Sequence, residues 1–131
     1  MKTFKKSAIL TVIAILSIFL ISCRSDSNDD GGSSNSYPKQ VSITYKVTGI
    51  NTSTAAIVTY KNETGGVTNV ENVDLPYSKT ITRTVNKYDD ASLGYGTNTN
   101  TNVKLEILVN NTVQKSQEFT STSGAVVYLF Q

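Results

Sequence analysis

The chain has 131 residues, enough for one small domain, and no histidine. Because histidine is the usual general base and the commonest metal ligand, this composition argues against Ser-His and Cys-His catalysis and against most transition-metal sites. Three of the twelve basic residues lie in the first six positions, and from Cys23 onward nine Lys and Arg stand against ten Asp and Glu, so the charge predicts no nucleic-acid partner.

The first 22 residues have the pattern of a secretory signal peptide. Lys2, Lys5 and Lys6 precede an apolar run over residues 8–21. This run is shorter than the roughly 20 apolar residues that a membrane-spanning helix requires. Segment 1–22 is therefore predicted to direct export and then to be removed.

Residues 20–23, Leu-Ile-Ser-Cys, resemble the lipobox of bacterial lipoproteins. The resemblance implies cleavage between Ser22 and Cys23 and acylation of Cys23, whose thiol is the only one in the chain. Several acyl chains give a stable anchor, because each buried CH₂ contributes about 0.8 kcal/mol. We therefore expect a cell-envelope protein held in a membrane through lipid on Cys23. The alternative is that Cys23 is an apolar residue at the end of a membrane helix.

Segment 23–39, which starts with the lipidated cysteine, is predicted to be a flexible linker. It is rich in Ser, Asp, Asn and Gly, with no apolar residue between that cysteine and Tyr37. Asp26, Asp29 and Asp30 resemble the acidic export tag of some lipoproteins of the Bacteroidota, which implies the outer membrane, with the domain either periplasmic or surface-exposed. The segment also opens like an EF-hand loop, but Tyr37 replaces the final Glu, so no metal site is predicted.

Residues 40–131 are predicted to form one all-β domain. Apolar and polar residues alternate through much of it, as in Val41, Ile43, Tyr45 and Val47. The fold class predicted is a small antiparallel β-sandwich of seven or eight strands, immunoglobulin-like. The expected strands cover residues 41–48, 55–61, 67–73, 78–85, 91–95, 103–109, 113–119 and 125–130.

Local signals add three details to this prediction. Gly94 and Gly96 weaken or bulge their strand. Asn110-Asn111 suits a two-residue hairpin, because Asn tolerates positive φ. The continuous apolar run over residues 125–130 predicts a central strand that is buried on both faces.

Five fragments of the domain occur in an order that resembles the extracytoplasmic domain of the MmpS (mycobacterial membrane protein small) family. They are residues 41–49 (VSITYKVTG), 58–60 (VTY), 73–80 (VDLPYSKT), 105–111 (LEILVNN) and 123–124 (SG). The resemblance implies a β-sandwich accessory protein, without catalysis, that partners a large membrane transporter of lipids, siderophores or drugs. The chain differs from that family in its lipobox in place of a transmembrane helix, in lacking a domain disulfide, and in Tyr77 where the family has Trp.

Leu75, Pro76 and Tyr77 are the predicted partner-contact residues, because an aromatic beside a rigid proline offers a surface to a protein, a sugar or a lipid. The alternative is that Tyr77 plugs the end of the sandwich. Asp89-Asp90, the one adjacent acid pair of the domain, suits a cation or a carboxylate dyad, or else a solvated turn. Adjacent strand residues point to opposite faces, which favours the turn.

The function predicted is that of a non-catalytic lipoprotein without a cofactor. It would act as a binding or adaptor module for an envelope export transporter or another envelope protein. The alternative is a cell-surface glycan-binding or adhesive module, in which Tyr77, Tyr88 and Tyr95 would gather at one end of the sandwich. A third hypothesis, an envelope hydrolase, requires two carboxylates that converge in a cleft.

Overall fold

The computed structural model describes residues 36–131. These residues form six β-strands and no helix. The predicted signal peptide 1–22, the cleavage and lipidation site at Ser22 and Cys23, and the acidic segment up to residue 35 lie outside the described residues. The strands are β1 (Lys39–Gly49), β2 (Thr54–Lys61), β3 (Val67–Asp74), β4 (Tyr77–Val85), β5 (Asp90–Val109) and β6 (Thr112–Leu129). The predicted all-β class is confirmed.

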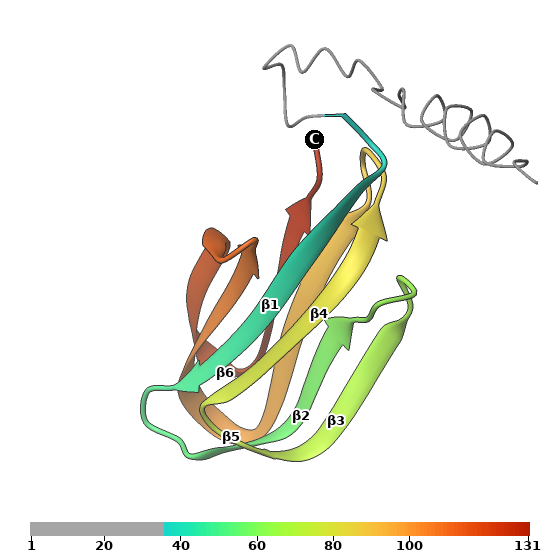
Figure 1. Ribbon diagram of the computed structural model, residues 1–131. Coiled ribbons are helices and arrows are strands. Elements are labelled where there is room, and N and C mark those ends of the chain that lie inside the picture. Colours follow the sequence, from blue (N-terminus) through green and yellow to red (C-terminus); the bar gives the residue numbers. More distant parts are fainter. Residues whose placement is uncertain (1–35) are drawn as a thin grey trace, which may run out of the picture. The chain divides into compact units, whose positions relative to one another are not determined.

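All strand pairs are antiparallel, and the sheet has the order β3-β2-β5-β1-β4, with β6 on the other side of β5. The long strands β5 and β6 serve two groups of neighbours. The C-terminal half of β5, residues 103–109, pairs with β1, whereas residues 93–96 of β5 pair with β2. The sheet therefore divides into a β4-β1 layer and a β3-β2 layer, which share the β5–β6 hairpin (Figure 1).

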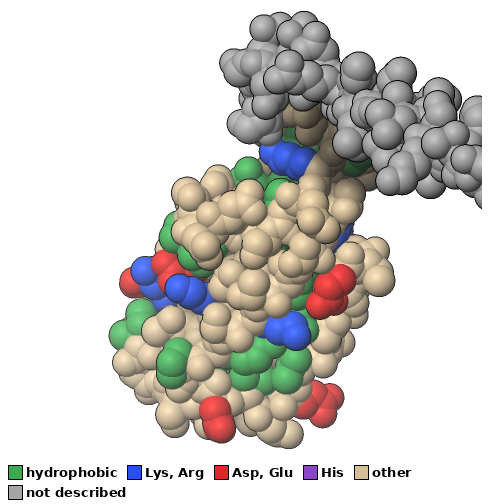
Figure 2. All heavy atoms as spheres, viewed as in Figure 1, with side chains coloured by type: hydrophobic (Ala, Val, Ile, Leu, Met, Phe, Trp, Pro, Cys, Tyr) green, Lys and Arg blue, Asp and Glu red, His purple; other side chains and the backbone are tan. Residues whose placement is uncertain are grey.

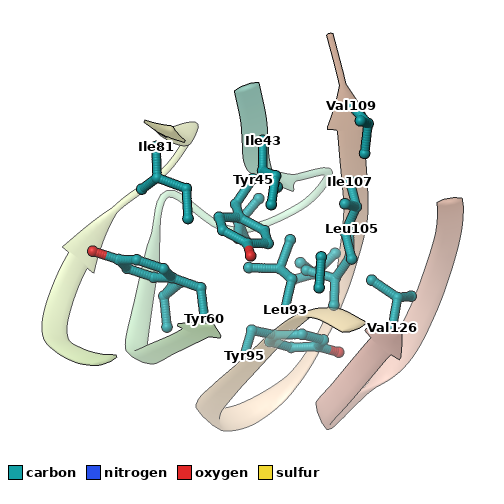
Figure 3. Close-up of a cluster of buried hydrophobic side chains, with 14 of the residues drawn as sticks. Ile43, Tyr45, Tyr60, Ile81, Leu93, Tyr95, Leu105, Ile107, Val109 and Val126 are labelled. Carbon is teal, nitrogen blue, oxygen red and sulfur yellow. The ribbon is translucent and has the colours of Figure 1, made fainter. Parts of the chain in front are cut away.

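The sheet curls so that side chains from both layers meet in one hydrophobic core. Ile43 and Tyr45 of β1, Leu105 of β5 and Val58 of β2 are fully or almost fully buried there. Figure 3 shows Tyr45 and Tyr60 reaching inward among the aliphatic side chains of the other strands, and their ring centroids lie 5.3 Å apart. Alternating inward-facing residues account for this core, as the period of two predicted.

The structure has six strands where the sequence predicted seven or eight. Segments 91–95 and 103–109 lie in the two halves of β5, and residues 113–119 and 125–129 lie in β6, which ends at Leu129. A polar stretch separates the two halves of β5, and the pairing of β5 with β6 shifts register there, between Gly96 and Thr101. The bulge bends the strand without ending its pairing with β6, so a polar stretch typical of a loop is part of a strand.

The prediction that residues 125–130 form a central strand is wrong. β6 pairs only with β5 in the described part of the chain, which makes it an edge strand. Val126 and Phe130 are 2% and 1% exposed, but Val127 and Leu129 are 53% and 44% exposed. The segment is apolar on both faces, and only its inner face is covered.

The predicted two-residue hairpin at Asn110-Asn111 is confirmed. Both residues have positive φ, 49° and 65°, and they connect β5 to β6. Asn110 also binds β1, because its side-chain Oδ1 accepts from the Ser42 N–H at 3.0 Å and its own N–H donates to the Ser42 carbonyl at 2.8 Å. This turn therefore fixes both the hairpin and its position on β1.

Candidate functional site

The domain has two ends, joined by the length of β1 and β4. The first, here the proximal end, holds Tyr37, whose hydroxyl donates to the carbonyl of Gln131 at 3.0 Å. The second, the distal end, is formed by the β1–β2 loop (residues 50–53) and the β3–β4 turn (residues 75–76). β4 pairs with β1 in a register that runs from Lys39–Val85 to Val47–Tyr77, so Leu75, Pro76 and Tyr77 lie at the end opposite the start of β1 (Figure 1).

Backbone contacts fix the two distal segments against each other. The Leu75 N–H donates to the Ser53 carbonyl at 2.9 Å. Gly49 lies beneath this junction: a Cβ placed there would overlap the Thr52 carbonyl and lie 3.1 Å from Leu75 Cδ1. The residue must be glycine because the β1–β2 loop folds back directly over it. The β1–β2 loop can therefore pack here without strain only if residue 49 has no side chain.

Tyr77 is half-buried and packs against the core, as does Leu75. Burial raises the pKa of Tyr77, and the electrostatic effect of the nearby Tyr60 adds to the increase. This position agrees with the alternative in which Tyr77 plugs the end of the domain, and the partner contact stays a prediction. The ring closes the end of the core, and part of its surface remains accessible to a partner.

The exposed part of the distal end includes two apolar side chains. Pro76 is exposed, and Ile50 in the facing loop is 53% exposed. The backbone of Ile50 is held in place, because its N–H donates to the Asn102 carbonyl at 2.8 Å. Sequence reasoning missed Ile50, although an isolated aliphatic residue in the polar turn Gly-Ile-Asn-Thr-Ser is a detectable signal. The arrangement offers a rigid contact surface.

The acid pair Asp89-Asp90 belongs to a network of ion pairs toward the proximal end. Lys61 pairs with the Asp90 carboxylate, and Arg83, which is buried, lies 3.4 Å from the Asp89 carboxylate. Arg83 Nη1 also donates to the Asp90 backbone carbonyl at 2.9 Å. Each carboxylate thus has a cation of its own. Its geometry ties the β4–β5 loop to β2 and β4.

Tyr45 supports this network from the core. Its hydroxyl donates to the Lys61 carbonyl at 2.8 Å. Burial raises the pKa of the Tyr45 phenol, and the Arg83 charge opposes that increase. Within residues 36–131, no group of three or more His, Cys, Asp or Glu is placed to hold a metal ion.

The three tyrosines expected to gather at one end do not do so, and that expectation was wrong. Tyr77 lies at the distal end, Tyr88 lies 67% exposed in the β4–β5 loop, and Tyr95 is 4% exposed in the core. The nine residues of β4 separate Tyr77 from the β4–β5 loop by roughly 27 Å, at about 3.4 Å per residue. An aromatic platform of the kind that stacks on sugars is therefore not formed by these residues.

The charged side chains visible in Figure 2 form small groups of both signs, separated by uncharged surface. That face of the described domain carries no broad field of one sign, in agreement with the near-balance of charges from Cys23 onward. In the described residues, no helix has the length and apolar character needed to cross a membrane.

The model of the family described as Mycobacterium membrane protein matches residues 6–129, which include the whole of β1 to β6. No curated protein matches the chain.

Proposed function

Because the chain belongs to the MmpS family of small, non-enzymatic accessory proteins associated with membrane transport, we propose that it is an adaptor for an envelope export transporter. The family match over residues 6–129 is the observation that carries this proposal. The family is one of membrane proteins, which agrees with an envelope location. Here we propose that the membrane attachment is lipid on Cys23, inserted in the outer membrane.

The distal end is the surface proposed to meet the transporter. Leu75 and Tyr77 are braced against the core, so the exposed ring of Pro76 has a fixed position. Preorganised contact residues lose little conformational entropy on binding, which favours such a surface over a mobile loop.

The proposal is tested by photo-crosslinking in cells from the distal end. A photoreactive amino acid replaces Ile50, which is exposed and outside the strands, and the lipidated protein is then captured and its adducts identified by mass spectrometry. Val113 supplies the matched control, because it is 49% exposed but lies at the start of β6, next to the hairpin turn. Capture of a large membrane transporter from position 50 and not from position 113 is the expected result.

Two outcomes contradict the proposal. Transporter adducts of equal yield from both positions would remove the distal end as the contact. Absence of any transporter adduct, with both variants present in the membrane at wild-type level, would remove the adaptor role.

A further inference from the structure

The C-terminal part of β6 has a free edge in the described structure. Phe130 donates its N–H to the Asp89 carbonyl at 2.9 Å, and its own carbonyl accepts from the Tyr88 N–H at 2.7 Å. Both groups of Phe130 thus face the β5 side. Because the groups of successive residues alternate in an antiparallel ladder, those of Ala125, Val127 and Leu129 point away from β5. These three residues present backbone donors and acceptors at the edge of the sheet.

The other edges of the sheet carry features that oppose pairing with another strand. Glu71 lies on β3, where Asn72 has a positive φ of 52° and interrupts the ladder to β2. Lys79 lies on β4, and Lys115 lies on the N-terminal half of β6. Charges and irregularities are the usual means by which edge strands avoid pairing. Residues 119–131 contain no Lys, Arg, Asp, Glu or Pro.

The side chains along this edge are also self-complementary. Ala125, Val127 and Leu129 share the outer face, and Val127 and Leu129 are about half exposed. If two copies of this edge run antiparallel around a two-fold axis at Val127, Val127 faces Val127 and the small Ala125 faces the large Leu129. Opposed apolar pairs of this kind stabilise a sheet, and no like charges meet.

From this edge we propose that two copies of the chain associate through antiparallel pairing of residues 124–130, which are the C-terminal part of β6 and the following Phe130, centred on Val127. The pairing satisfies about six backbone hydrogen bonds and extends the β3-β2 layer across both copies. It is an isologous contact, which closes after two subunits. The contact is short, below the roughly 1,200 Å² of a standard stable interface, so the dimer exchanges readily and is best detected by covalent trapping.

Disulfide trapping of the full chain in cells tests this register. Val127→Cys places two thiols on residues about 5.5 Å apart between Cα atoms, within the range that a disulfide spans. Leu129→Cys is the matched control, since its Cα atoms lie roughly 14 Å apart in the same dimer. After mild oxidation we expect at least about tenfold more reducible dimer of twice the chain mass from Val127→Cys than from Leu129→Cys.

A double variant and a background control complete the experiment. Ala125→Cys with Leu129→Cys restores crosslinking, because these positions face each other across the two-fold axis. The wild-type chain, with Cys23 alone, measures dimers that form through that thiol. Thermal unfolding of each variant establishes that the exposed substitutions preserve the fold.

Three results would overturn the proposal. Equal yields from the two single variants would indicate random collision of the copies. A folded Val127→Cys variant without dimer would show that the edge does not pair with itself. An adduct of Val127→Cys to a different protein, in place of the dimer, would assign the edge to that protein.

Discussion

Tyr45 is the residue at which the core and the ion-pair network meet. The side chain is fully buried, its ring packs on Tyr60, and its hydroxyl donates to the Lys61 carbonyl. Burial raises the pKa of the phenol, since the phenolate would lose its hydration. The folded protein therefore holds Tyr45 in its neutral form at pH values where an unfolded chain releases the proton.

The substitution Tyr45→Phe tests this account through pH. Near neutral pH, losing the hydrogen bond should lower the free energy of unfolding by about 1 kcal/mol. Above pH ~10, Tyr45 ionises in the unfolded chain but not in the folded protein. The wild type therefore loses stability as the pH rises, whereas the Phe variant has no phenol at this position and does not lose stability in this way. The difference between the two proteins should therefore shrink between about pH 7 and about pH 11 in urea unfolding.

Tyr88→Phe is the control for this measurement, because Tyr88 is 67% exposed in the β4–β5 loop. It should follow the wild-type profile. A difference between Tyr45→Phe and the wild type that stays constant across the pH range would contradict the burial of the phenol.

Among the strands, the β5–β6 hairpin connects the two layers of the sheet. The two strands run beside each other through both layers, and their turn requires positive φ at Asn110 and Asn111. Asn110 is committed to hydrogen bonds with Ser42, so Asn111 is the position at which the turn conformation can be tested alone.

Asn111→Val should destabilise the domain by about 1–2 kcal/mol, because a β-branched residue is strained at positive φ. Asn111→Gly should match or exceed the wild-type stability, since glycine adopts this conformation freely. Chemical denaturation of both variants measures the two effects. Equal stability of the Val and Gly variants would show that the turn tolerates another conformation.

The two ends of the domain organise the whole molecule. The described chain starts beside its C-terminus, where Tyr37 contacts Gln131, and the distal surface lies at the other end of β1 and β4. A membrane anchor that precedes residue 36 thus joins the domain at the end away from Pro76. This arrangement suits an adaptor whose contact surface faces away from its point of attachment.

Cys23→Ser tests the proposed anchor. Without the thiol no thioether forms, so we expect the variant to lose labelling by a clickable fatty acid. We also expect less of the protein in the membrane fraction. Membrane fractionation measures the change, with Ser25→Ala as a neighbouring variant that preserves the thiol. Full retention of unlabelled wild-type protein in the membrane would instead support the alternative, in which residues 8–21 remain as a membrane helix.

Much of the fold follows from local pattern. The alternation Val41, Ile43, Tyr45, Val47 determines which face of β1 is buried, because side chains on a strand point to opposite sides in turn. Asn110-Asn111 determines a hairpin through backbone preference alone. The proposed contact residues Leu75, Pro76 and Tyr77 were selected from sequence, since proline and an adjacent aromatic mark a rigid turn at the end of a strand.

Tertiary structure determined which strands pair with each other and which charged side chains form ion pairs. Residues 125–130 have the composition of a central strand, yet β6 lies at an edge, because strand order depends on how the long hairpin is shared between the layers. Likewise, Arg83 is a buried ion-pair partner of Asp89, and its burial depends on the packing of the whole domain. Sequence by itself determined the all-β class, the inward face of β1 and the family, since these depend on local conformation and on the order of motifs. The edges, the ion pairs and the exposure of Ile50 and Val127 required the folded chain, because each depends on contacts between residues that local preferences do not bring together.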